Sequence, residues 1–319
     1  MLSEQLEKVK IVPVLVLNTL DEGLAVCEQL CRNGLPAAEI TFRTAAAESV
    51  IREAVKRFPD MFIGAGTVLN IADLHRAFDA GAKFAVAPGF NPKVVAEAVK
   101  CGLDFFPAVC TPSEVEQAME FGCRMLKFFP AEACGGVPML KSIIAPYKHL
   151  GVKFMPTGGI NAKNINSYLA FDKILACGGS WMVKKDLVAA GEFDKIRDLT
   201  KEAVQTMLGF ELAHIGINCD SETEAEKTAD AFDGLFGFTK KVGNSSVFAG
   251  TAVEAMKSKG LGSKGHIAVA TNSVVRAKNY LEMMGYKFNE ESAKFKGDKM
   301  TAIYLADEIG GFAVHLVQK

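Results

Sequence analysis

A lysine stands inside a short apolar run of the sequence, Met125-Leu126-Lys127-Phe128-Phe129. Burying an ammonium group without a partner is costly, and burial favours the neutral amine. A neutral lysine amine can attack a carbonyl carbon and form an imine, which is the chemistry of Schiff-base enzymes. The simpler interpretation is a lysine at a strand end whose ammonium reaches water. The run alone leaves both interpretations open.

Polar and apolar residues alternate in a second stretch, Glu39-Ile40-Thr41-Phe42-Arg43. Because successive residues of a strand face opposite sides, its three polar residues are expected to share one face. A carboxylate can transfer protons, and a guanidinium has the planar shape that matches a carboxylate. A solvated ion pair at a strand end is the simpler alternative. It does not easily explain three polar residues directed inward from one strand.

Short apolar runs alternate with helical patterns between residue 10 and about residue 180. This alternation predicts an α/β fold with a parallel sheet covered on both faces, and eight repeats predict a closed (β/α)8 TIM barrel. A doubly wound open sheet is the alternative, but no G-x-G-x-x-G follows the first strand. The expected strands span residues 11–16, 38–42, 62–64, 83–87, 104–107, 124–128, 153–156 and 173–177. The expected helices include residues 20–33, 45–57, 71–80, 92–100, 113–121 and 193–208.

Glycine-rich segments follow three of the expected strands. Glycines after the last two strands of a barrel let backbone N–H groups approach an anion, and phosphate commonly binds there. One Gly-Gly pair also fits an ordinary turn, whereas two pairs at adjacent positions favour a phosphate site. The segments are Gly64-Ala65-Gly66-Thr67, Thr157-Gly158-Gly159-Ile160 and Gly178-Gly179-Ser180.

Composition narrows the class of protein. The chain has 319 residues, 49% of them hydrophobic and 23% charged, as expected of a globular protein with one large domain or two. The net charge of -1 and the lack of a long basic run argue against nucleic acid as the main partner. Residues 1–10 do not resemble a signal peptide, and no apolar run is long enough to span a membrane. Eight scattered cysteines without a C-x-x-C pair indicate reduced thiols in the cytoplasm.

Residues 1–209 closely resemble the 2-keto-3-deoxy-6-phosphogluconate (KDPG) aldolases, which overlap with the 4-hydroxy-2-oxoglutarate (KHG) aldolases. The resemblance implies a class I aldolase in which Lys127 forms the Schiff base and Glu39 shuttles protons. It implies that Arg43 and Thr67 hold the pyruvate carboxylate. It also implies that Pro88, Phe129 and Thr157 contact the substrate. The phosphate would be bound by Gly158, Gly159, Gly179 and Ser180. The matching runs are Glu39-Ile40-Thr41-Phe42-Arg43-Thr44, Gly64-Ala65-Gly66-Thr67-Val68, Ala87-Pro88-Gly89, Lys127-Phe128-Phe129-Pro130-Ala131-Glu132, Pro156-Thr157-Gly158-Gly159-Ile160 and Gly178-Gly179-Ser180-Trp181.

The same resemblance implies a small-molecule substrate and no cofactor for the aldolase. KDPG would be cleaved to pyruvate and glyceraldehyde 3-phosphate, and KHG to pyruvate and glyoxylate, by a homotrimer. A lyase for another 2-keto-3-deoxy sugar acid is one alternative. A metabolite- or metal-sensing binding protein with a degenerate barrel is another, but the intact set of Lys127, Glu39, Arg43 and Thr67 argues against degeneracy.

Residues 210–319 contain an internal repeat. Residues 213–217 are similar to residues 265–269, and each copy continues with a helical stretch and ends in a similar strand. His214 matches His266 in the two copies, and Glu254 matches His315. Imidazole and carboxylate ligands together suit zinc, manganese, iron or nickel. Packed or exposed remnants of a duplication are the alternative.

This repeat is similar to the glyoxalase-like, vicinal oxygen chelate family, which pairs two βαβββ modules around a metal. The resemblance implies a smaller α+β domain of two such modules over residues 210–319. It implies that His214, Glu254, His266 and His315 are the ligands of a divalent metal, with His315 standing where glutamate is usual. No catalytic role is carried over to this domain.

Overall fold

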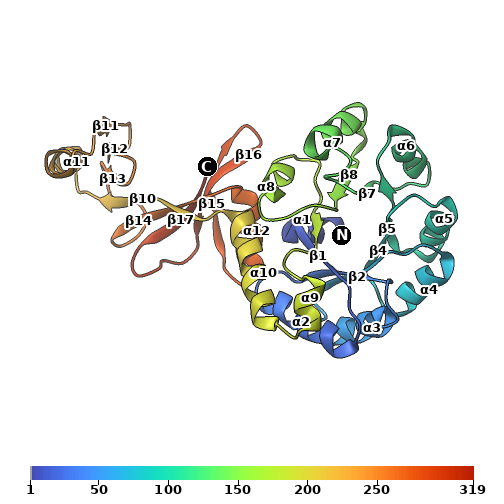
Figure 1. Ribbon diagram of the computed structural model, residues 1–319. Helices are drawn as coiled ribbons and strands as arrows, with labels where there is room; N and C mark the ends of the chain where they lie inside the picture. Colours follow the sequence, from blue (N-terminus) through green and yellow to red (C-terminus); the bar gives the residue numbers. More distant parts are fainter. Residues whose placement is uncertain (1) are drawn as a thin grey trace. The chain divides into compact units, whose positions relative to one another are not determined.

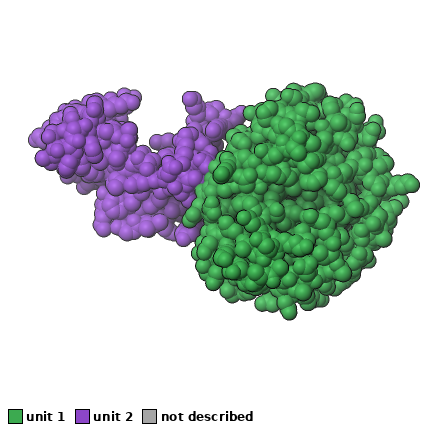
Figure 2. Space-filling view, in the orientation of Figure 1, with its two compact units in different colours: residues 1–207 green, residues 208–319 purple. Residues whose placement is uncertain are grey.

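The computed structural model describes residues 2–319, which divide into two compact units (Figures 1 and 2). The boundary falls between Met207 and Leu208, at the end of helix α10 (Phe193–Leu208). We call the two parts unit 1 and unit 2 and describe each by itself. None of the helices in the described part of the chain combines the length and apolarity needed to cross a bilayer.

Unit 1 is a curled sheet of parallel strands surrounded by helices (Figure 1). Parallel pairing runs from β1 through β2, β3 and β4 to β5, and separately from β6 through β7 to β8. β9 closes the circuit, because it pairs with β1 and because Gly178 forms a bridge with Thr157 after β8. The strands are β1 (Ile11–Leu15), β2 (Ala37–Thr41), β3 (Phe62–Gly66), β4 (Phe84–Val86), β5 (Asp104–Phe106), β6 (Ala108–Val109), β7 (Met125–Phe128), β8 (Lys153–Pro156) and β9 (Cys177–Gly179).

Four helices of unit 1, α2, α4, α5 and α6, begin at a residue whose side chain caps the helix. Thr19 and Thr111 each form a capping box with the glutamate three residues later, Glu22 and Glu114. The predicted helices are all present, with ends within two residues of those expected. The helices are α1 (Leu2–Val9), α2 (Leu20–Arg32), α3 (Ala47–Arg57), α4 (Ile71–Asp79), α5 (Pro92–Cys101), α6 (Pro112–Glu120), α7 (Gly136–Ile144), a 3₁₀ helix (Ala145–Leu150), α8 (Ile165–Leu169), α9 (Lys185–Ala189) and α10.

The α/β fold with a curled parallel sheet is confirmed, but two predicted strands differ. The fifth is interrupted at Pro107, which has no N–H to donate and separates β5 from β6. The eighth covers Cys177–Gly179 instead of residues 173–177, so Gly178 and Gly179 lie within a strand and not after it. No element was expected before β1, yet α1 forms there, and its Leu6 is fully buried in the core with Val12.

Unit 2 is a β-rich domain built on one mixed sheet, with strand order β11-β12-β13-β10-β14-β17-β16-β15. The central strands β10 and β14 are antiparallel, and each is followed along the chain by a helix and three strands. The strands are β10 (Glu211–Asn218), β11 (Lys240–Val242), β12 (Ser246–Ala249), β13 (Val253–Met256), β14 (Gly265–Thr271), β15 (Phe288–Lys296), β16 (Lys299–Leu305) and β17 (Ala313–Gln318). The helices are α11 (Glu222–Phe236) and α12 (Val274–Met283).

Candidate active site and candidate metal centre

Lys127 and Glu39 form a buried ion pair inside unit 1. The Lys127 Nζ lies 3.1 Å from each carboxylate oxygen of Glu39, and the two side chains are only 6% and 2% exposed. Lys127 comes from β7 and Glu39 from β2. The Nζ also lies 5.6 Å from the centre of the Phe129 ring, within the range of a cation–π interaction. The alternative of an ammonium that reaches water is therefore wrong.

A cavity of about 320 Å³ has this ion pair in its wall. Its walls are formed largely by residues at or just beyond the C-terminal ends of the strands, where barrel enzymes place their active sites. Sequence reasoning missed two lining residues, Val14 and Ile160, because an apolar side chain has no functional group that marks it as part of a site. Their positions, Val14 near a strand end and Ile160 next to Gly159, are the features that could have indicated them. The other lining residues are the predicted ones: Glu39, Arg43, Thr67, Pro88, Lys127, Phe129, Thr157, Gly158, Gly159, Gly179 and Ser180.

Three polar residues of the β2 region, Glu39, Thr41 and Arg43, were expected to share the inward face, and Thr41 differs from this expectation. Glu39 and Arg43 line the cavity. The Thr41 hydroxyl instead donates a hydrogen bond of 2.8 Å to the Leu15 carbonyl and is buried there. Thr41 therefore joins β2 to β1 and is absent from the cavity wall.

Gly66 leaves the space that the Glu39 carboxylate occupies. A Cβ atom at residue 66 would lie 2.3 Å from Glu39 Oε1 and 2.6 Å from its Cγ. Gly66 is the last residue of β3 and faces Thr41 across the sheet. The small residue on the neighbouring strand thus allows Glu39 to extend to Lys127.

The next residue, Thr67, has a φ of 58°, in the left-handed region. A β-branched residue in that conformation is strained, and such strain persists only where the surrounding structure holds it. Thr67 is at the same time part of the cavity wall. The backbone turn after β3 therefore directs this residue into the site at a local energetic cost.

Gly158 and Gly159 form a tight loop after β8, with φ values of 99° and 82° that favour glycine. The loop is tied to the segment after β7, because the Ala131 N–H donates to the Thr157 carbonyl at 2.8 Å and the Glu132 N–H to the Gly158 carbonyl at 3.0 Å. These bonds use the carbonyl groups of the loop. Within residues 2–319 the Gly159 N–H donates no hydrogen bond and is available to an anion, whereas the Gly158 N–H faces Gly178 across the bridge that joins Thr157 to Gly178.

Residues 2–199 match the family model described as KDPG and KHG aldolase, which is well over half of the chain. The chain belongs to this family. It is an aldehyde-lyase of the KDPG/KHG aldolase type, and the match ends before unit 2 begins.

Individual relatives agree with this assignment. The chain is 45% identical over 201 residues to a 2-dehydro-3-deoxy-phosphogluconate aldolase of Haemophilus influenzae, covering 63% of this chain and 94% of that protein. A KDPG aldolase structure from Legionella pneumophila, with pyruvate captured as a covalent carbinolamine, matches at a TM-score of 0.61 and 34% identity, covering 64% and 98% of the two chains. The Zymomonas mobilis aldolase with 3-phosphoglycerate matches at a TM-score of 0.58 and 36% identity, covering 63% and 94%.

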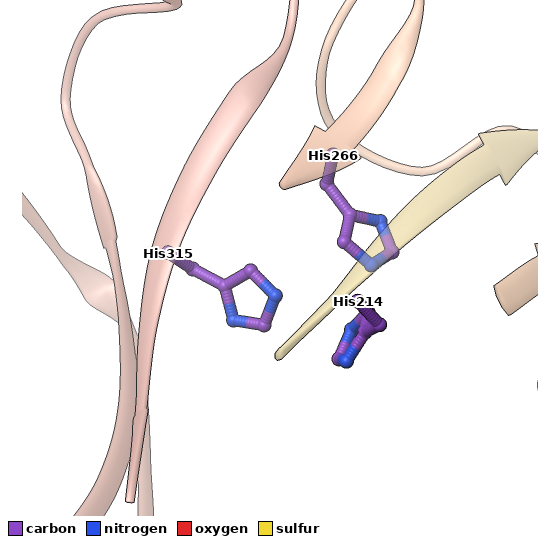
Figure 3. A group of neighbouring side chains, drawn as sticks. All are labelled: His214, His266 and His315. Atoms are coloured by element: carbon purple, nitrogen blue, oxygen red, sulfur yellow. The ribbon is translucent and has the colours of Figure 1, made fainter. Parts of the chain in front are cut away.

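In unit 2 of this aldolase, three histidines from three neighbouring strands point toward one another (Figure 3). The ring centres of His214 and His266 are 5.3 Å apart, those of His214 and His315 are 5.6 Å apart, and those of His266 and His315 are 5.1 Å apart. Glu254 on β13 joins them. Its Oε2 lies 3.1 Å from His214 Nε2 and 3.0 Å from His266 Nε2. The structure thus brings together all four of the predicted metal ligands.

The register of the sheet explains this convergence. Gly216 on β10 faces His266 on one side and Glu254 on the other. Ala268 on β14 faces His214 and His315 in the same way. A Cβ atom at residue 216 would lie 2.0 Å from the His266 ring, so the imidazole fills space that only glycine leaves. Small residues on the two central strands therefore make room for the cluster.

The protonation states of His315 and Glu254 suit a divalent metal. Burial, followed by the nearby His266 and His214, lowers the pKa of His315 to about 3 and keeps it neutral. Burial alone would raise the pKa of Glu254, but the adjacent His214 imidazole and the hydrogen bonds with His266 and Ser246 outweigh it and hold that pKa well below its usual range. Neutral imidazoles and an ionised carboxylate are the forms that bind metals.

The hydrogen bonding of the cluster also leaves room for a ligand. Neither ring nitrogen of His315 has a hydrogen-bond partner within the described residues, although the side chain is buried. The His315 ring is held in place by stacking on Tyr304, with ring centres 4.5 Å apart. Buried polar atoms without a partner are uncommon, and a metal ion would satisfy them. The four side chains of the cluster therefore suit a divalent metal ion.

Proposed function

We propose that this family member is a class I enzyme that cleaves KDPG to pyruvate and glyceraldehyde 3-phosphate. The observation that carries the proposal is the Lys127 Nζ held 3.1 Å from both Glu39 carboxylate oxygens in the wall of a cavity. An amine beside a carboxylate can give up its proton and become a nucleophile. The capture of pyruvate as a carbinolamine in the Legionella pneumophila relative supports the same first step here.

In the proposed reaction, the Lys127 amine attacks the C2 carbonyl carbon of the substrate. Loss of water then gives a protonated imine, which serves as the electron sink. Glu39 takes the proton of the C4 hydroxyl, the C3–C4 bond breaks, and its electron pair moves into the imine to give an enamine. C4 leaves as the aldehyde carbon of glyceraldehyde 3-phosphate. Glu39 returns its proton to C3, and water releases pyruvate from Lys127.

The two ends of the substrate are proposed to bind at different walls of the cavity. Arg43 offers a planar pair of donors to the pyruvate carboxylate, and Thr67 lies in the same wall. The Gly159 N–H, which donates no hydrogen bond within residues 2–319, supports a phosphate site at the other end. Gly179 and Ser180 line the same cavity. The 3-phosphoglycerate bound to the Zymomonas mobilis aldolase supports a phosphorylated ligand.

Steady-state kinetics with three substrates tests this proposal. KDPG is expected to show the highest kcat/KM, and KHG a lower one because it has no phosphate to occupy the glycine loop. An unphosphorylated 2-keto-3-deoxy sugar acid is expected to be cleaved most slowly. A higher kcat/KM for the unphosphorylated sugar acid than for KDPG would contradict the proposal and favour the alternative lyase.

We also propose that unit 2 binds a divalent transition metal through His214, Glu254, His266 and His315. Three imidazoles, of which those of His266 and His315 are buried, and one carboxylate suit zinc, manganese, iron or nickel. The strand-helix-three-strand succession in each half of the sheet supports two βαβββ modules of the vicinal oxygen chelate type. A bound metal would supply a Lewis acid to an oxygen-containing ligand.

Metal analysis of the full chain tests the second proposal. The protein is loaded with zinc, manganese, nickel or iron, freed of excess metal and measured by mass spectrometry of the element. About one ion per chain is expected for at least one metal, with a large loss in the double variant His214→Ala/His266→Ala. His149→Ala is the control, because His149 is exposed and lies in unit 1. Equal metal content in all three proteins would favour a remnant of duplication.

We further propose a homotrimer that works in the cytoplasm. The trimer follows from the resemblance to the KDPG aldolases, and the compartment from the eight scattered cysteines, which form no C-x-x-C pair. Light scattering during size-exclusion chromatography measures the mass of the assembly. The trimer should have three times the 34.3 kDa of one chain. A mass of one or two chains would contradict it.

A further inference from the structure

Tyr168 and Glu132 form a buried contact behind the glycine loop. Tyr168 belongs to α8 and is 1% exposed, among the largest fully buried side chains of the described chain. Its hydroxyl donates a hydrogen bond to Glu132 Oε1. Burial, together with the Glu132 carboxylate, raises the pKa of Tyr168, so the phenol keeps its proton and remains a donor.

The stem of Glu132 lies against Gly159. A Cβ atom at Gly159 would lie 2.6 Å from both Cβ and Cγ of Glu132. The far end of the side chain lies beside Gly136, where an added Cβ would be 3.1 Å from Glu132 Oε1 and 3.3 Å from the Tyr168 hydroxyl. The Glu132 side chain therefore runs past the glycine loop and ends at Tyr168.

The position of this carboxylate matters because of its charge. Glu132 is exposed as a residue and is absent from the cavity lining, yet its N–H is bonded to the Gly158 carbonyl. An anion that binds to the Gly159 N–H would be close to the Glu132 stem, because that stem lies against Gly159. Like charges at short range repel unless they are held apart. Only the end of the side chain is fixed by Tyr168, and without that bond it could turn toward the loop.

We propose that Tyr168 and Glu132 are positioning residues for the phosphate end of the substrate. Tyr168 anchors the Glu132 carboxylate away from the cavity. The Glu132 stem and N–H hold the Gly158-Gly159 loop in the shape that presents the Gly159 N–H. This inference rests on the proposed function, because it assumes a phosphorylated substrate at that loop.

Kinetics of Tyr168→Phe tests the inference. Loss of the hydroxyl frees the carboxylate, so the KM for KDPG should rise about tenfold, as expected for one lost hydrogen bond to a charged group, with kcat nearly unchanged. Exchange of the pyruvate methyl protons with solvent uses no phosphate and should keep its wild-type rate. Tyr147→Phe is the matched control, because Tyr147 donates a similar hydrogen bond of 2.9 Å to Glu116 but lies outside the cavity wall.

A second variant separates this role from a merely structural one. In Tyr168→Phe/Glu132→Gln the freed side chain carries no charge, so the KM for KDPG should return to near the wild-type value. A persistent high KM in the double variant, or an equal loss of pyruvate proton exchange in Tyr168→Phe, would overturn the inference. An unchanged KM in Tyr168→Phe would overturn it as well. The proposed function has its own test: if it is wrong, the wild-type protein does not cleave KDPG at all.

Discussion

A single added methyl group at Gly66 should move Glu39 away from Lys127 without removing either catalytic group. The new Cβ of Gly66→Ala would lie 2.3 Å from Glu39 Oε1, whereas an ordinary contact is at least 3.4 Å, so the carboxylate must move by about 1 Å. The atoms that must yield belong to the Glu39 side chain, whose Cγ and Cδ would also lie 2.6 Å and 2.9 Å from the new Cβ. Gly66 has no positive φ, so alanine can adopt its backbone conformation.

The size of the effect follows from that displacement. A misplacement of about 1 Å in an active site costs roughly 100-fold in rate, which corresponds to about 2.7 kcal/mol of lost transition-state stabilisation. Glu39 is needed for proton transfer, whereas Lys127 forms the imine. The kcat for KDPG cleavage should therefore fall about 100-fold, while the imine of Lys127 with pyruvate should still form.

Two assays on the same variant check this reasoning. Pyruvate release from KDPG is followed with a coupled dehydrogenase, and imine formation by borohydride trapping with pyruvate. Gly89→Ala is the matched control, since a Cβ there meets no atom within 4 Å. A kcat for Gly66→Ala within about twofold of the control, far from the 100-fold loss expected for a displaced catalytic group, would refute the account of Glu39.

Three further predictions follow from the same geometry. Glu39→Gln should leave pyruvate binding largely intact and slow cleavage by about 10²- to 10⁴-fold; wild-type turnover would refute its role. Gly159 has a φ of 82°, and a Cβ added there would lie 2.6 Å from Glu132. Gly159→Ala should therefore raise the KM for KDPG more than the KM for KHG. Equal changes in the two KM values would argue against a phosphate loop. His315→Ala should weaken zinc binding at least about tenfold in isothermal titration, and unchanged affinity would remove His315 from the ligand set.

Strand and helix patterns predicted most of unit 1 because each element is short and regularly punctuated. The eighth strand shows the limit of such patterns. The run before Cys177 has the apolar residues typical of a strand, whereas Gly178 and Gly179 have low strand propensity. Pairing with β1 places the strand on the glycines nevertheless. Tertiary pairing of this kind is not visible in a local window of sequence.

The chemical groups of the site could be identified from their types, but their supports could not. Lys127 and Glu39 stand out as polar residues in apolar strands, and matching repeats identified His214 and His266. The contact of Gly66 with Glu39 depends on how two neighbouring strands align. The Tyr168 hydrogen bond to Glu132 joins residues 36 positions apart, one on helix α8 and one in the segment after β7. Such contacts are set by packing in three dimensions.

Borohydride reduction in the presence of pyruvate, followed by peptide mass spectrometry, tests the central claim most directly. The buried Lys127 beside Glu39 is the predicted imine-forming residue. The account predicts one pyruvate-dependent adduct, located on Lys127 and lost in Lys127→Ala together with KDPG cleavage. An adduct on another lysine, or undiminished trapping in Lys127→Ala, would contradict it.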